Sequence, residues 1–170
     1  MKLLVSVLCC AALWGIPTLA QKPAPSAMTD QKFVDLVAQT DMLEAHLGQM
    51  AQNQAKGQDV KDYAQMLITD HTNDYQKLGP LAGKANLTVP NGLDAEHDKI
   101  IASFEKLNGA AFDSHYIHAM IAGHTKAIEV YKKEAAEAES PDLKEYAGET
   151  LPALQKHLDG AKDLSKQGSK

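Results

Sequence analysis

Apolar residues recur every three or four positions through most of the chain after residue 30, which is the spacing of one face of an α-helix. No stretch keeps the alternation of apolar and polar residues that is typical of a half-buried strand. Turn and capping signals interrupt the helical pattern at Gly57, "VPNG", Asn108-Gly109 and Ser140-Pro141. The sequence therefore predicts five helices, over residues 30–56, 58–85, 93–107, 110–139 and 141–166.

Four of these helices are long, and none of the four can bury its apolar stripe alone. The connections between the long helices are short, long and short, and the helix over 93–107 lies inside the long one. This order is typical of ferritin-like bundles, in which the second and third long helices run parallel. We therefore predict an all-α fold, a ferritin-like four-helix bundle with one long crossover that contains a short helix.

The chain before the bundle follows a different pattern. Residues 1–20 carry a lysine at position 2, continue with a short apolar run and end with small residues, as secretory signal peptides do. Cys9 and Cys10 lack the small preceding residue of a lipid-attachment site, and we interpret them as apolar filler. The predicted organisation is a signal peptide over 1–20 cleaved after Ala20, a flexible linker over 21–29, the bundle over 30–166 and a flexible tail over 167–170.

Composition narrows the classes of partner. The net charge of −5 becomes −6 once Lys2 leaves with the signal peptide, and every basic residue is a lysine. Nucleic-acid recognition depends on arginine and on a basic surface, so nucleic acid is not an expected partner. The mature chain would hold no cysteine and no apolar run long enough to span a membrane. A periplasmic or otherwise exported protein is predicted, and the sequence gives no indication of its oligomeric state.

A rotation of about 100° per residue separates the seven histidines into two groups. Four are predicted to be exposed, because they point away from the apolar stripes or lie in the charged connector: His46, His97, His115 and His118. The other three fall within the apolar arcs of the second, third and fourth long helices, and one glutamate does so in the first: His71, His124, His157 and Glu44. Each of these four residues lies near the midpoint of its helix. Since midpoints meet in antiparallel helices joined by short turns, we expect the four side chains at one level.

Three imidazoles and one carboxylate form a ligand set that suits zinc, iron, manganese or copper. The sequence thus predicts a transition-metal site made of Glu44, His71, His124 and His157. Asp70 and Asp74 are candidates to accept a ring N–H or to act as an extra ligand. In the alternative interpretation, the carboxylate pairs with an imidazole, and a metal-free polar layer sets the register of the helices.

Asp113 also faces inward, but it lies about three helical turns before His124. We therefore expect it to cap or orient the chain near the connector and leave it out of the metal site. Tyr63, Tyr116 and Tyr131 are expected to pack in the core with their hydroxyls satisfied.

Four motifs, "DMLEAHLGQMA", "MLITDHT", "FDSHYIHAMIAGH" and "LPALQKHL", resemble those of a bacterial envelope family, domain-of-unknown-function family 4142, often labelled predicted outer membrane protein. The resemblance covers about residues 30–165 and implies a ferritin-like fold, export and a function that is not established. The positions that match its motifs are Glu44, Asp70, His71, Phe112, Asp113, Tyr116, His124, Pro152 and His157. Di-iron proteins of this fold use Glu-x-x-His motifs, which are absent before the three inward-facing histidines. A carboxylate-bridged di-iron centre is therefore not expected.

Two functions remain open from the sequence. The first is an exported protein that binds a transition metal for metal buffering or for redox or peroxide chemistry. The second is a non-catalytic periplasmic protein, structural or stress-related, whose histidine layer holds no metal and whose charged surface meets a partner. No catalytic residue is indicated for either function.

Overall fold

The computed structural model describes residues 28–168, which form five helices. Their bounds are α1 (Asp30–Gln54), α2 (Gln58–Lys84), α3 (Ala95–Phe104), α4 (Gly109–Glu137) and α5 (Pro141–Gln167). Each helix agrees with a predicted one to within a few residues at either end. The predicted signal peptide, its cleavage after Ala20, the cysteine pair and most of the predicted linker lie outside the described residues.

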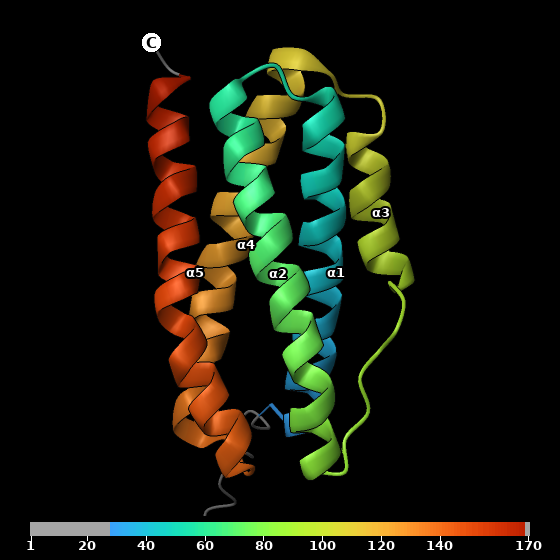
Figure 1. Ribbon diagram of the computed structural model, residues 1–170, viewed down its shortest axis with the longest axis vertical. Coiled ribbons are helices and arrows are strands. Elements are labelled where there is room, and N and C mark those ends of the chain that lie inside the picture. The colour runs from blue at the N-terminus through green and yellow to red at the C-terminus, as the bar shows by residue number, and fades with distance from the viewer. Residues whose placement is uncertain (1–27, 169–170) are drawn as a thin grey trace, which may run out of the picture.

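The four long helices form two antiparallel hairpins, α1 with α2 and α4 with α5, which lie side by side (Figure 1). Because α1 also packs against α4 and α2 against α5, the helices are arranged in the ring α1, α2, α5, α4. The crossover from α2 runs back along the bundle, so α2 and α4 are parallel (Figure 1). Within the crossover, α3 packs against α1. The ferritin-like bundle predicted from the sequence is therefore confirmed.

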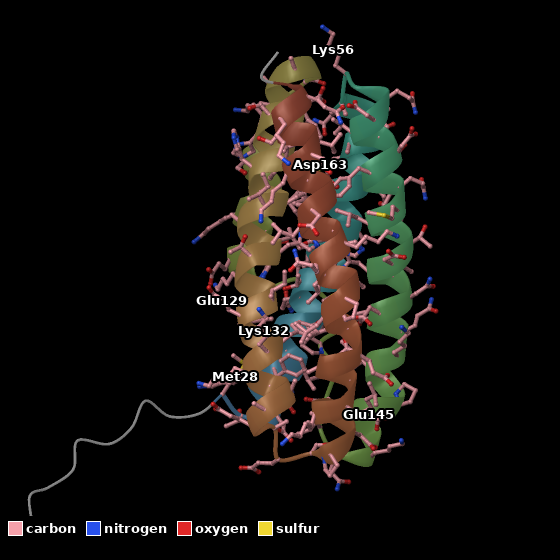
Figure 2. All side chains as sticks on the ribbon, turned by 90° about the vertical axis from the view of Figure 1, so that its left-hand side faces the viewer. Met28, Lys56, Glu129, Lys132, Glu145 and Asp163 are labelled. Carbon is pink, nitrogen blue, oxygen red and sulfur yellow. The ribbon has the colours of Figure 1, made fainter. Side chains whose placement is uncertain are left out.

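The turns of the two hairpins lie at opposite ends of the bundle. Figure 2 places Lys56, in the turn between α1 and α2, near one end, and Glu145, in the first turns of α5, near the other. Asp163 lies toward the same end as Lys56. None of the helices in residues 28–168 is long and apolar enough to cross a membrane.

Two aspartates link the hairpins to each other. One lies near the start of α4 and binds the turn between α1 and α2, and the other lies at the start of α1 and binds the turn between α4 and α5. The two carboxylate oxygens of Asp113 in α4 accept hydrogen bonds of 2.9 Å from the backbone N–H groups of Lys56 and Gly57. At the opposite end, Asp30 in α1 accepts from the N–H groups of Glu139 and Ser140, at 3.0 and 2.7 Å. These bonds satisfy N–H groups where the helices cannot, and they hold the two hairpins at a set height relative to each other. Asp113 thus caps and orients the chain, as predicted.

The core consists of two apolar clusters separated by a polar layer. On α1, one cluster ends at Ala38 and the other begins at Leu47. Between them lie two buried acids, Asp41 and Glu44. His71 on α2 takes the same position between Leu67 of one cluster and Leu78 of the other. The candidate site is therefore enclosed along the bundle axis by apolar side chains.

Candidate metal centre

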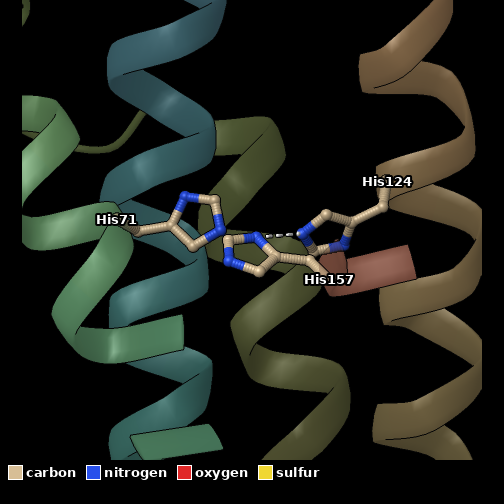
Figure 3. Close-up of side chains that lie close together, drawn as sticks. All are labelled: His71, His124 and His157. Atoms are coloured by element: carbon tan, nitrogen blue, oxygen red, sulfur yellow. Dashed lines mark hydrogen bonds between the residues drawn. The ribbon is translucent and has the colours of Figure 1, made fainter. Parts of the chain in front are cut away.

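Three buried histidines from three different helices meet inside the bundle (Figure 3). His71 of α2, His124 of α4 and His157 of α5 are 4, 1 and 2% exposed, and one ring nitrogen from each lies within 4.8 Å of the others. The remaining histidines are outside this cluster: His46, His115 and His118 are exposed, and His97 is half-buried beside Asp94. The helical rotation thus predicted the three buried histidines and the exposure of His46, His115 and His118, whereas His97 is less exposed than expected.

Glu44 adds a side chain from the remaining long helix, α1, to the same cluster. Its side chain is buried, and Oε2 lies 3.0 Å from Nε2 of His71 and 3.5 Å from Nε2 of His124. The structure therefore brings together all four residues that the sequence placed at one level. A single side chain from each long helix contributes to the cluster.

The ring orientation of His124 follows from its hydrogen bond to the backbone. Its Nδ1 lies 2.9 Å from the carbonyl oxygen of Met120, one turn earlier in α4. Because a carbonyl can only accept, Nδ1 carries a proton, and Nε2 is the nitrogen directed at the cluster. Nε2 lies 3.2 Å from Nδ1 of His157, the contact drawn as a dashed line in Figure 3.

The other two rings are held by carboxylates. Nδ1 of His71 lies 2.8 Å from Oδ1 of Asp41, and Nε2 of His157 lies 2.9 Å from Oδ2 of Asp70. Each of the three histidines thus has one ring nitrogen on an acceptor outside the cluster and the other nitrogen directed into it. Metal-binding histidines are oriented in this way in proteins, because the outer hydrogen bond sets the tautomer and the angle of the ring.

Sequence reasoning did not single out Asp41, which is 2% exposed. The signal was its spacing, because Asp41 precedes Glu44 by three residues and so lies on the same face of α1. Asp70 contacts His157 rather than its sequence neighbour His71, since successive helical residues point in directions about 100° apart.

Asp74 has partners outside the histidine cluster. Its Oδ2 accepts a hydrogen bond from the hydroxyl of Tyr146 in α5. Its Oδ1 lies 3.9 Å from Nζ of Lys77, which is largely exposed. Asp70 therefore takes the position of an acceptor for a ring nitrogen, whereas Asp74 accepts from a tyrosine hydroxyl.

The buried charges of the cluster shift one another's protonation. Burial raises the pKa of Glu44, but the charges of His71 and His124 outweigh it and hold that pKa at about 2. Burial lowers the pKa of His71, but Glu44 and the hydrogen bond to Asp41 raise it well above the usual range. Burial lowers the pKa of His157, against the opposing effect of Asp70. Glu44 and His71 therefore carry opposite charges near neutral pH.

Two atoms at the centre of the cluster lack hydrogen bonds. Oε2 of Glu44 and Nε2 of His71 are only 3.0 Å apart, yet both are buried without a hydrogen bond of suitable direction. An unsatisfied buried polar group is unfavourable, and more so when it is charged. Three histidine nitrogens lie within 4.8 Å of one another, and Oε2 of Glu44 lies beside two of these rings, so the donor set fits a transition-metal ion, which would satisfy both atoms.

Two cavities reach the cluster, one from the side of the bundle formed by α2 and α5 and the other from the side formed by α1 and α4. One, of about 440 Å³, includes His71 and His157 in its lining and extends between α2 and α5. The other, of about 480 Å³, lies among α1, α3 and α4 and reaches Glu44. Gly123 lines this second cavity, and a Cβ there would lie 3.6 Å from Oε1 of Glu44. The cluster is therefore buried but adjoins open space.

The fold is similar to that of several solved proteins. CopM in its Cu(II)-bound form is 17% identical, with a TM-score of 0.68, covering 82% of this chain and 97% of that one. CopM in its Cu(I)-bound form is 15% identical, with the same TM-score and coverage of 82 and 96%. A DUF305 protein from Streptomyces coelicolor is 12% identical, with a TM-score of 0.64 and coverage of 85 and 96%. No curated protein matches the sequence. The family described as Domain of unknown function (DUF4142) matches residues 16–164, and this chain therefore belongs to that family.

Proposed function

We propose that this chain is an exported protein that binds one transition-metal ion midway along the bundle through Glu44, His71, His124 and His157. The observation that carries the proposal is the orientation of the three rings. Each holds its outer nitrogen on an acceptor and directs its other nitrogen into the cluster, where Oε2 of Glu44 lies 3.0 Å from Nε2 of His71 and 3.5 Å from Nε2 of His124. A polar layer that served packing alone would not require all three inner nitrogens to converge.

The donor atoms narrow the choice of metal. Three imidazoles and a carboxylate suit zinc, iron, manganese or copper, and a site of this kind generally binds Cu²⁺ most tightly and Mn²⁺ least tightly. The similar fold of CopM, solved with Cu(I), Cu(II) and silver, supports metal binding by this bundle. We expect Cu²⁺ to compete best for the site.

Two roles are compatible with such a centre. A buffering protein would bind and release the ion without further reaction, whereas copper or iron held at an accessible position supplies redox or peroxide chemistry. The cavity between α2 and α5 provides access for a small molecule. Peroxide consumption by the copper- or iron-loaded chain, compared with the zinc-loaded chain, separates these roles.

Export rests on the amino-terminal sequence. Residues 1–20 have the pattern of a signal peptide, with cleavage expected after Ala20. In a bacterial host, the mature chain recovered from the periplasmic fraction should begin at Gln21 by intact-mass analysis. Recovery of the full chain from the cytoplasm alone would contradict export.

The second candidate is a metal-free polar layer in a structural or stress-related protein. The observation that favours it is that the cluster can pair internally. Glu44 and His71 carry opposite charges, and His124 and His157 lie within hydrogen-bond distance of each other. Such a layer would set the register of the helices without any ion.

Metal analysis of the purified mature chain distinguishes the two candidates. About one equivalent of Cu²⁺ or Zn²⁺ should remain after loading and dialysis, and it should be lost in His71→Ala and His124→Ala. His115→Ala and His118→Ala are matched controls, because both histidines are exposed on α4, outside the cluster. A wild-type chain that stays metal-free after loading with zinc, iron and copper would support the second candidate instead.

A further inference from the structure

The two oxygens of Asp41 have different surroundings. Oδ1 lies 2.8 Å from Nδ1 of His71, whereas Oδ2 is buried without any hydrogen-bond partner, and the residue is only 2% exposed. A buried carboxylate oxygen without a partner is strongly unfavourable unless a proton or a cation lies next to it. The histidine cluster does not supply this partner, because His71 contacts the other oxygen.

Asp41 opens onto the cavity of about 440 Å³ between α2 and α5. Asp74 lines the same cavity from α2, and its side chain is only 14% exposed. The lining also includes neutral side chains that carry oxygen atoms: Thr40, Asn73, Thr150, Tyr131 and Tyr146. Two carboxylates from adjacent helices therefore share a cavity that also offers hydroxyl and amide oxygens.

Acidic side chains outnumber basic ones in the lining of this cavity, which includes Asp41, Glu44, Asp70, Asp74 and Glu149 against Lys77, His71 and His157. Lys77 approaches Asp74 only from the exposed rim, where water screens its charge. A cation placed between the two aspartates would remove their mutual repulsion.

We propose that this cavity contains a second cation site, separate from the histidine cluster, in which the carboxylates of Asp41 and Asp74 bind a hard divalent cation such as Mn²⁺ or Mg²⁺. Hard cations take oxygen ligands and commonly keep several waters, so two carboxylates with neutral oxygens around them suffice. Nitrogen donors, by contrast, favour zinc or copper, so the two sites select different metals. Asp41 lies between the sites, with Oδ1 on His71 and Oδ2 on the cation.

The test is a titration with Mn²⁺ after one equivalent of Zn²⁺ has been loaded, because Zn²⁺ holds a histidine site against Mn²⁺. Free Mn²⁺ is measured by electron paramagnetic resonance, and wild type should bind one ion. Asp74→Asn should weaken that binding roughly tenfold or more, since it removes one of two negative ligands. Asp163→Asn is the matched control, because Asp163 is exposed on α5 and paired with Lys166, and it should bind like wild type.

A second measurement avoids any effect of substitution on folding. In the wild-type chain, bound Mn²⁺ should broaden the ring resonances of Tyr131 and Tyr146, which line the cavity, more than those of Phe104 at the end of α3. Absence of Mn²⁺ binding, equal binding by wild type and Asp74→Asn, or equal broadening of all three rings would overturn the proposal.

The cation site can be tested even if the proposed transition-metal site, on which the zinc loading relies, does not bind metal. If Zn²⁺ does not bind, the titration is repeated on zinc-free His124→Ala, which lacks one imidazole but keeps both aspartates. Mn²⁺ binding by this variant, lost on further substitution Asp74→Asn, supports the cation site even though the histidine site has failed. Failure of His124→Ala to bind Mn²⁺ would overturn the cation site as well.

Discussion

The Nε2 atom of His124 lies 3.2 Å from the Nδ1 atom of His157, so two imidazoles from the antiparallel helices α4 and α5 face each other with their inner nitrogens. A hydrogen bond between these atoms requires that one of them carry a proton. A metal ion in the cluster would need both lone pairs. Metal and proton therefore compete for the same atoms.

This competition predicts that metal binding releases protons. The pKa of His71 is raised by Glu44 and Asp41, in spite of burial, so its ring is protonated at pH 7 and must lose a proton to bind a metal. We expect about one proton or more to be released per Zn²⁺ and the apparent affinity to rise with pH. Calorimetric titration in buffers of different ionisation enthalpy measures the proton number. An affinity that did not change between about pH 6 and pH 8 would contradict a histidine site.

The carboxylates behind the rings should affect zinc affinity to different extents. Asp41→Asn removes a buried partner of His71 and should weaken Zn²⁺ binding about 10- to 100-fold. Asp70→Asn should have a smaller effect, because the Asp70 side chain is 41% exposed and water can replace it beside His157. Competition with a chromophoric chelator measures both affinities. Equal losses in the two variants would indicate that burial of the partner is unimportant.

Stability should depend on pH through Glu134, which is buried in α4. Burial, together with the charges of Asp30 and Glu137, raises the pKa of Glu134 to about 7. In the unfolded chain the pKa of Glu134 is near 4.5, so the unfolded state loses this proton at a lower pH than the folded state does. Stability therefore decreases as the pH rises from about 4.5 through the folded pKa. Glu134→Gln should therefore raise the melting temperature at pH 8 more than at pH 4.

Glu129→Gln is the matched control for this variant, because Glu129 is exposed on the same helix (Figure 2). It should change the melting temperature little at either pH. A Glu134→Gln effect that is the same at both values would show that the carboxyl of Glu134 does not titrate in this range.

The aspartate that ties the turn between α1 and α2 should contribute to stability. Asp113→Ala leaves the N–H groups of Lys56 and Gly57 without their acceptor and should lower the free energy of unfolding by about 2 kcal/mol. Urea denaturation followed by circular dichroism measures the change. Asp62→Ala is a suitable comparison, since Asp62 makes only an exposed hydrogen bond to Gln58 and should have little effect.

Much of this protein follows from local sequence. Ser140 and Pro141 begin α5 as predicted, with the Ser140 hydroxyl accepting from the N–H of Leu143, because capping depends on residues adjacent in the chain. The burial of His71 and Glu44 follows from helical rotation, and their common level follows from the nearly equal lengths of the helices. These properties need only the geometry of single helices and the presence of short turns.

The pairing of side chains between helices was decided only by the tertiary structure. Asp41 contacts His71, and Asp70 contacts His157 rather than the adjacent His71. Each of these contacts depends on how far one helix is rotated and shifted relative to the next. The same packing places Asp74 against Tyr146, away from the histidines. A residue on the buried face of a helix has several possible partners within reach on the neighbouring helices. The sequence alone therefore determined which residues enter the core. The packing of the helices determined what each of these residues contacts.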